Sequence, residues 1–221
     1  MTGNRNLIIS YLTMRRLIGI LGVALPVLVV GGGILQNGLI VQGSISSYYY
    51  SNMRDCFVGI LCIVSLFLIS YKGYDRIDDI VANMSGIFAL GLVIFPTGMF
   101  SGRVERVGIF LVEDSISEYV HLIFGALFFL SLSFNSMFLF TRREPGFMSR
   151  EKRRRNIVYR ACGIIMTATI AFLTLYTIFW RGTIISKMNP VLILESIALL
   201  AFGASWLVKG NTLFKDKRVS H

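Results

Sequence analysis

The feature that most constrains this chain is a series of long apolar runs separated by short polar segments. The stretch 17–53 contains no charged residue, and its first part, 17–35, is long enough to cross a membrane as a helix. Hydrophobic residues make up 54% of the 221 residues and charged residues only 15%. We therefore predict an all-α bundle of six transmembrane helices forming a single integral membrane domain, 1–221. The predicted spans are roughly 17–35, 53–71, 80–99, 119–140, 157–180 and 190–208.

Several classes of protein are excluded by the same pattern. The connecting segments are too short for a soluble domain, and the sequence contains no G-x-S-x-G elbow, Walker A loop, dinucleotide fingerprint or H-E-x-x-H motif. The only histidines are His121 and His221, which makes a zinc site built from several histidines implausible. We predict no cofactor and no metal.

The basic residues predict the orientation of the bundle. The net charge is +10, and the basic residues cluster on one side of the predicted membrane, as the positive-inside rule expects for cytoplasmic segments. Both termini are therefore predicted to be cytoplasmic, and no nucleic-acid partner is needed to explain the charge. The residues on that side are Arg5, Arg15, Arg16, Lys72, Arg76, Arg142, Arg143, Arg150, Lys152, Arg153, Arg154, Arg155, Lys209, Lys215, Lys217 and Arg218, against Arg54, Arg103, Arg106, Arg181 and Lys187 on the other.

Capping residues predict where two of the helices begin. Asp78 or Asp79 can cap the third helix, and Ser149 can cap a helix that starts in the cytoplasm and continues into the fifth span. Both helices would then start on the basic side of the bundle.

Ionisable residues inside spans are costly in lipid and are candidate functional positions. The uncharged run Cys56–Tyr71 is too short to cross the hydrocarbon core as a helix, so Arg54 and Asp55 are drawn to the membrane boundary. The sixth span reaches spanning length only if it starts near Pro190, which places Glu195 roughly 7–8 Å below the helix start.

The fourth span adds Glu118 and His121, whose Glu-x-x-His spacing places both side chains on one helix face. With Arg54, Asp55 and Glu195, these residues occupy the outer halves of their spans. We therefore hypothesise a polar cavity in the outer leaflet, built from the second, fourth and sixth helices. A purely structural role is the alternative, in which Arg54 or Arg181 neutralises the carboxylates and His121 is a hydrogen-bonded boundary residue.

Four sequence blocks carry a resemblance to a known group of proteins. They are S-I-S-S-Y-Y-Y-S-N-M-R-D-C-F-V-G at 44–59, Y-K-G-Y-D at 71–75, G-I-F-A-L-G-L-V-I-F-P-T at 86–97 and K-R-R-R-N-I-V-Y-R at 152–160. The chain resembles a bacterial family of polytopic membrane proteins of unknown function. That resemblance implies a location in the bacterial cytoplasmic membrane and marks Ser46, Arg54, Asp55 and His121 as motif positions.

A fainter likeness links Ser46 and Asp55 to membrane hydrolases of the ceramidase and adiponectin-receptor type. Those enzymes hold zinc with three histidines, which this chain lacks, so the likeness does not carry hydrolase activity to it.

These observations predict binding of a lipid or small amphipathic molecule in a sensor, carrier or accessory role, with membrane lipids as partners. One alternative is a lipid-modifying hydrolase, with Asp55 or Glu195 as general base and His121 as the acid or orienting group. Another is a proton- or ion-coupled transporter with Glu195 as the titrating carboxylate. The sequence does not indicate an oligomeric state. The predicted ligand-binding residues are Ser46, Arg54, Asp55, Glu118, His121, Arg181 and Glu195.

Overall fold

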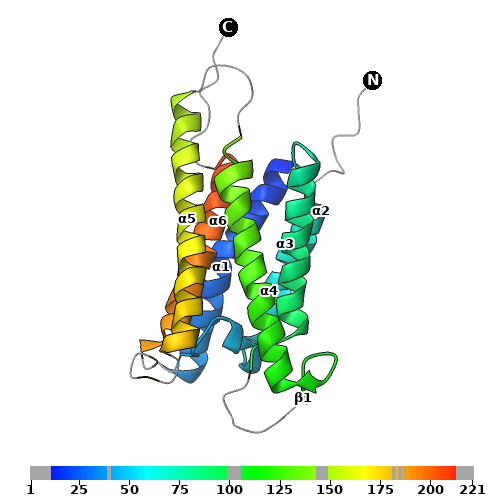
Figure 1. Ribbon diagram of the computed structural model, residues 1–221, viewed down its shortest axis with the longest axis vertical. Coiled ribbons are helices and arrows are strands. Elements are labelled where there is room, and N and C mark those ends of the chain that lie inside the picture. The colour runs from blue at the N-terminus through cyan, green and yellow to red at the C-terminus, as the bar shows by residue number, and fades with distance from the viewer. Residues whose placement is uncertain are drawn as a thin grey trace.

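Six long helices running alternately up and down make up most of the protein (Figure 1). The computed structural model describes residues 11–38, 41–98, 106–142, 149–180, 183, 186 and 188–212. The prediction of an all-α bundle is confirmed. The helices are α1 (Tyr11–Asn37), α2 (Arg54–Ser70), α3 (Arg76–Ile94), α4 (Asp114–Phe134), α5 (Arg150–Phe179) and α6 (Pro190–Lys209), with a π-helical turn η2 (Asn135–Leu139) extending α4.

Five of these helices are long and apolar enough to cross a membrane, counting α4 together with η2. They indicate a multi-pass membrane protein. The remaining helix, α2, has 17 residues, which is about 25 Å of helix and shorter than a hydrocarbon core of about 30 Å. Arg54 and Asp55 form its first turn and are both exposed.

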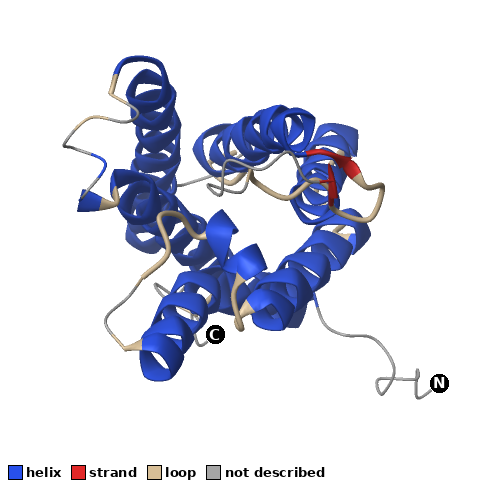
Figure 2. Cartoon of the chain, turned by 90° about the horizontal axis from the view of Figure 1, so that it is seen from below, coloured by secondary structure: helices blue, strands red, loops and turns tan. Residues whose placement is uncertain are grey.

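The helices form a ring, because each packs against its neighbour in the chain and α6 packs against α1. Figure 2 shows this arrangement along the bundle. Glycines bring α1 and α6 close together: a Cβ atom on Gly203 would lie 2.7 Å from the carbonyl oxygen of Gly19 and 2.7 Å from the amide nitrogen of Val23.

The caps at the start of α3 and α5 set where these helices begin. Ser149 caps α5 by accepting a hydrogen bond from the amide of Lys152, as predicted. The predicted capping of α3 by Asp78 or Asp79 is wrong, because the helix begins earlier and its cap is Asp75, which accepts from the amides of Ile77 and Asp78. Instead, Asp78 and Asp79 accept from the amides of Tyr74 and Gly73 and so hold the preceding turn against the helix.

One end of the bundle, which we call the basic end, contains the starts of α1, α3 and α5 and the ends of α2, α4 and α6 (Figure 1). Here Arg16 donates to the carbonyl of Gly210, and Arg15 donates to the hydroxyl of Tyr71. The ring of Tyr71 packs in turn on Trp206. The two ends of the described chain therefore meet on one side, as a bundle with an even number of helices requires.

The opposite end, which we call the loop end, contains a short 3-10 helix and a small hairpin. The 3-10 helix η1 (Ser46–Tyr50) fills part of the space between the helix ends, with Tyr48 and Tyr49 buried. The hairpin pairs β1 (Arg106–Val107) with β2 (Val112–Glu113), directly before α4.

Candidate functional site

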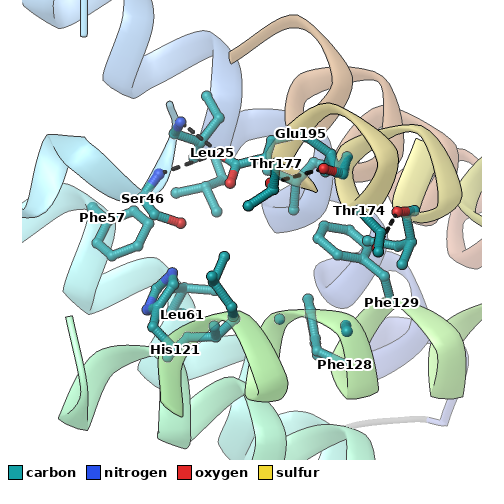
Figure 3. Close-up of a pocket in the computed structure, with 18 of the residues that line it drawn as sticks. Leu25, Ser46, Phe57, Leu61, His121, Phe128, Phe129, Thr174, Thr177 and Glu195 are labelled. Atoms are coloured by element: carbon teal, nitrogen blue, oxygen red, sulfur yellow. Dashed lines mark hydrogen bonds between the residues drawn. The ribbon is translucent and has the colours of Figure 1, made fainter. Parts of the chain in front are cut away.

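A cavity of about 230 Å³ lies inside the ring, on the side of the loop end. All six helices and the segment around η1 contribute to its wall (Figure 3). The polar side chains among the lining residues are Ser46, His121, Thr174, Thr177 and Glu195. The rest are apolar: Leu25, Ile45, Phe57, Leu61, Leu92, Leu122, Gly125, Ala126, Phe128, Phe129, Ile170, Leu173, Ile178 and Leu199.

Glu195 joins the cavity wall to the loop that precedes η1. Its Oε2 atom accepts a hydrogen bond of 2.6 Å from the amide of Ile45 and a longer one of 3.4 Å from the amide of Ser46. These N–H groups lie at the start of η1, where helical hydrogen bonding leaves donors without a partner. The carboxylate on α6 therefore satisfies backbone donors that the loop itself cannot satisfy.

Further hydrogen bonds hold the same loop in place. The carbonyl of Gly43 accepts from the amide of Leu192 in the first turn of α6, at 3.1 Å. Within the loop, the hydroxyl of Ser44 accepts from the amide of Ser47 and lies 2.6 Å from the Ser47 hydroxyl. The loop is thus attached to α6 at two points, and it presents Ser46 to the cavity.

His121 reaches the cavity from the opposite side, on α4 (Figure 3). Its side chain is 5% exposed, and its Nδ1 atom lies 2.8 Å from the carbonyl oxygen of Phe95. Because a carbonyl oxygen only accepts, Nδ1 carries the hydrogen of this bond, which leaves Nε2 of the neutral ring as an acceptor. A second bond between the same segments, from Ser117 to the carbonyl of Pro96, anchors the chain after α3 on α4.

The other predicted site residues lie elsewhere. Asp55 and Arg54 are exposed and do not line the cavity. The guanidinium of Arg54 donates to the Tyr49 hydroxyl at 2.9 Å and lies 4.5 Å from the centre of its ring. Glu118 is partly buried, and its carboxylate lies against Gly98 rather than in the cavity. Arg181 lies outside the described residues.

The structure therefore brings together Ser46, His121 and Glu195 from the predicted set. It adds Thr174 and Thr177 on α5, which the sequence analysis did not single out. Their spacing of three places both on one face of a helix, and that spacing is the signal that could have identified them. Within the described part of the chain, no three His, Cys, Asp or Glu residues are grouped so that they could hold a metal ion.

The cavity opens between α4 and α5. Three of its lining residues are also exposed on the outside of the bundle: Leu122 is 43% exposed, Ile178 is 66% exposed, and Thr174 is exposed as well. Side chains that are at once in the wall of a cavity and on the outer surface mark its mouth. Both helices expose apolar side chains next to this mouth, such as Ile123 and Leu175, and apolar surface of this kind faces lipid in a multi-pass protein.

Comparisons of the chain with protein-family models, with curated proteins and with solved structures found no match.

Proposed function

We propose that this chain is a protein of the bacterial cytoplasmic membrane that binds a lipid or small amphipathic molecule in the cavity, as a carrier, sensor or accessory protein. The observation that carries the proposal is the lining of the cavity: a largely apolar wall in which Ser46, His121 and Glu195 supply the polar groups. Ligand sites generally have this composition, with a few polar groups orienting a mostly apolar ligand. The resemblance to bacterial polytopic membrane proteins supports the membrane assigned.

The volume of the cavity limits the size of the ligand that can bind. A dry cavity of about 150 Å³ binds benzene, and drug-sized ligands occupy pockets of about 300–1,000 Å³. At about 230 Å³, this cavity fits a single hydrocarbon chain or a small amphipathic molecule better than a whole phospholipid with two chains. A longer chain can extend through the opening between α4 and α5.

The position of the opening supports loading from the membrane. A molecule dissolved in the hydrocarbon can pass Leu122 and Ile178 without crossing water, whereas the loop end is covered by η1 and its hydrogen bonds to α6. We therefore expect the ligand to partition into the bilayer first and into the protein second.

Native mass spectrometry of the purified protein tests the proposal. We expect a molecule with one hydrocarbon chain to stay bound after gentle removal from the membrane. Ala126→Trp fills the cavity wall with a large side chain and should remove that molecule. Ala171→Trp is the matched control, because Ala171 is exposed on α5 and does not line the cavity.

Two results would contradict binding. One is retention of the same molecule by Ala126→Trp. The other is recovery of only a chemically cleaved product from wild-type protein supplied with intact lipid, which would favour the hydrolase alternative. The folding of both variants is checked by their thermal unfolding.

A further inference from the structure

The hydrogen-bond donors around the cavity are already used by the protein, and this restricts the polar end of its ligand. Thr174 and Thr177 each donate the hydroxyl hydrogen to a carbonyl of their own helix, that of Ile170 at 2.9 Å and that of Leu173 at 2.8 Å. A hydroxyl has one hydrogen and two lone pairs, so both threonines can only accept from a ligand.

The N–H groups nearer the loop end are also already hydrogen-bonded within the protein. The Nδ1 hydrogen of His121 is bonded to Phe95, and the amides of Ile45 and Ser46 are bonded to Glu195. The hydroxyl of Ser46 lies close to the same carboxylate. None of these N–H groups, and neither threonine hydroxyl, is left to donate to a ligand.

The polar groups that face the cavity are therefore mainly acceptors. They are Nε2 of His121, the threonine oxygens and the Glu195 carboxylate, and among the described lining residues there is neither lysine nor arginine. An anionic group placed here would bring lone pairs against lone pairs with no cation to compensate, which is costly in an apolar surrounding. A group that carries hydrogens would instead complete the unused acceptors.

We infer that the ligand is a single-chain amphiphile whose polar end is an amine or a hydroxyl group rather than a carboxylate or a phosphate. This inference rests on the proposed function, because it assumes that the cavity is occupied. It goes further in naming the chemistry of the end group. That chemistry follows from the hydrogen bonds already made by the donors around the cavity, and from the lack of lysine and arginine among the described lining residues.

Four probes with the same octyl chain separate the end groups: octylamine, octanol, octyl methyl ether and octanoate. Each is titrated into the protein held in phosphatidylcholine nanodiscs, so that no detergent competes for the cavity. The thermal unfolding midpoint reports binding, since a ligand of the folded state stabilises it. We expect the amine and the alcohol to bind about tenfold more tightly than the ether and the carboxylate, the effect of a hydrogen bond or two.

Two variants test the assignment of the acceptors. Glu195→Gln keeps an oxygen that can accept from the amide of Ile45, but it turns an NH2 donor toward the cavity. This variant should therefore bind octylamine more weakly than wild type does, and bind the ether and octanoate more tightly. Ser196→Ala is its control, because the hydroxyl of Ser196 bonds its own helix and does not line the cavity. Thr177→Val removes an acceptor and should weaken only the probes that carry hydrogens, unlike Thr169→Val, which alters a threonine outside the cavity.

The outcomes separate the two proposals. Equal binding of all four probes, or tightest binding of octanoate, overturns the inference on the end group while leaving a ligand cavity in place. Binding of no probe, in wild type and variants alike, overturns the proposed function and this inference with it. If Glu195→Gln leaves the order of the probes unchanged, Glu195 is not the acceptor that selects the end group.

Discussion

The carboxylate of Glu195 accepts a hydrogen bond of 2.6 Å from the backbone amide of Ile45, which precedes it by 150 residues. Through this bond a charged residue of α6 serves two purposes. It satisfies the start of η1, and it forms part of the wall of the cavity. The structural and the functional explanations of an ionisable residue within the membrane are therefore compatible here.

The bond between Glu195 and the loop predicts the effect of removing the carboxylate. Glu195→Leu leaves the amides of Ile45 and Ser46 without their acceptor, and we expect a loss of about 1–3 kcal/mol in the free energy of unfolding. Hydrogen exchange at the amide of Ile45 should speed up in the same variant. Glu195→Gln retains an acceptor oxygen and should keep most of the protection, so equal exchange in both variants would contradict this account.

The close approach of α1 and α6 predicts a large effect from a single methyl group. Gly203→Ala places a Cβ atom 2.6 Å from Cγ2 of Val23 and 2.7 Å from the backbone of α1, so the helices must separate. We expect a destabilisation of about 1–3 kcal/mol, measured by thermal or denaturant unfolding in detergent.

Gly31→Ala provides the matched control for this contact. Gly31 lies within α1, the partner helix in this contact, but a Cβ atom there would meet nothing within 4 Å. Since alanine favours the helix over glycine by about 1 kcal/mol, this variant should be neutral or slightly more stable. A similar loss of stability in both variants would show that the packing of α6 is not the cause.

The cap of α3 predicts a dependence of stability on pH. The amides of Asp78 and Ile77, together with the guanidinium of Arg142, hold the pKa of Asp75 below its ordinary value of 3.8. A carboxylate with a lowered pKa stabilises the folded state above its unfolded pKa, and this contribution is lost as the pH falls through the lower folded value.

Unfolding measured from neutral to acidic pH checks this contribution. The free energy of unfolding of wild type should exceed that of Asp75→Ala by a modest and constant margin at neutral pH. This margin should begin to shrink near pH 3.8 and should be smallest below the lowered pKa of the folded state. A margin that persisted in strong acid would mean that the charge of Asp75 does not contribute.

The distribution of basic residues predicts that both termini are cytoplasmic. A fluorescent protein fused to the C-terminus of the chain should fold and fluoresce in bacteria, and alkaline phosphatase at the same position should be inactive. A phosphatase inserted in the turn between β1 and β2, at Ile109 or Phe110, should by contrast be active, because both residues lie at the loop end and are exposed. The opposite pattern would reverse the bundle and place the cavity in the inner leaflet.

Much of the fold could be predicted because the lipid environment leaves few alternatives. An apolar run in a bilayer must satisfy its own backbone, and only a helix does so within one segment, so the helical class of the fold follows from composition. The bounds follow less closely, since α1 begins at Tyr11 and α4 at Asp114, before the predicted spans 17–35 and 119–140. Ser149 as a cap is a local feature of the same kind. The cap of α3 was missed because Asp75, Asp78 and Asp79 are alike in sequence, and only the observed start of the helix distinguishes them.

The candidate site could be predicted only in part. Depth along a helix follows from counting residues, which predicts a similar depth for Glu195 and His121, and both residues line the same cavity. Rotation about the helix axis does not follow from counting, because packing against neighbouring helices sets it, and so Asp55 faces outward despite its similar depth.

The sequence by itself determined that this chain is a bundle of membrane helices with its basic residues gathered toward one end, since hydrophobicity and charge act on each segment separately. Only the tertiary structure decided that the loop around Ser46 folds back onto Glu195, and that Thr174 and Thr177 on the neighbouring helix α5 also line the cavity. The reason is that a cavity is defined by the surfaces that several helices leave uncovered, and no single segment contains that information.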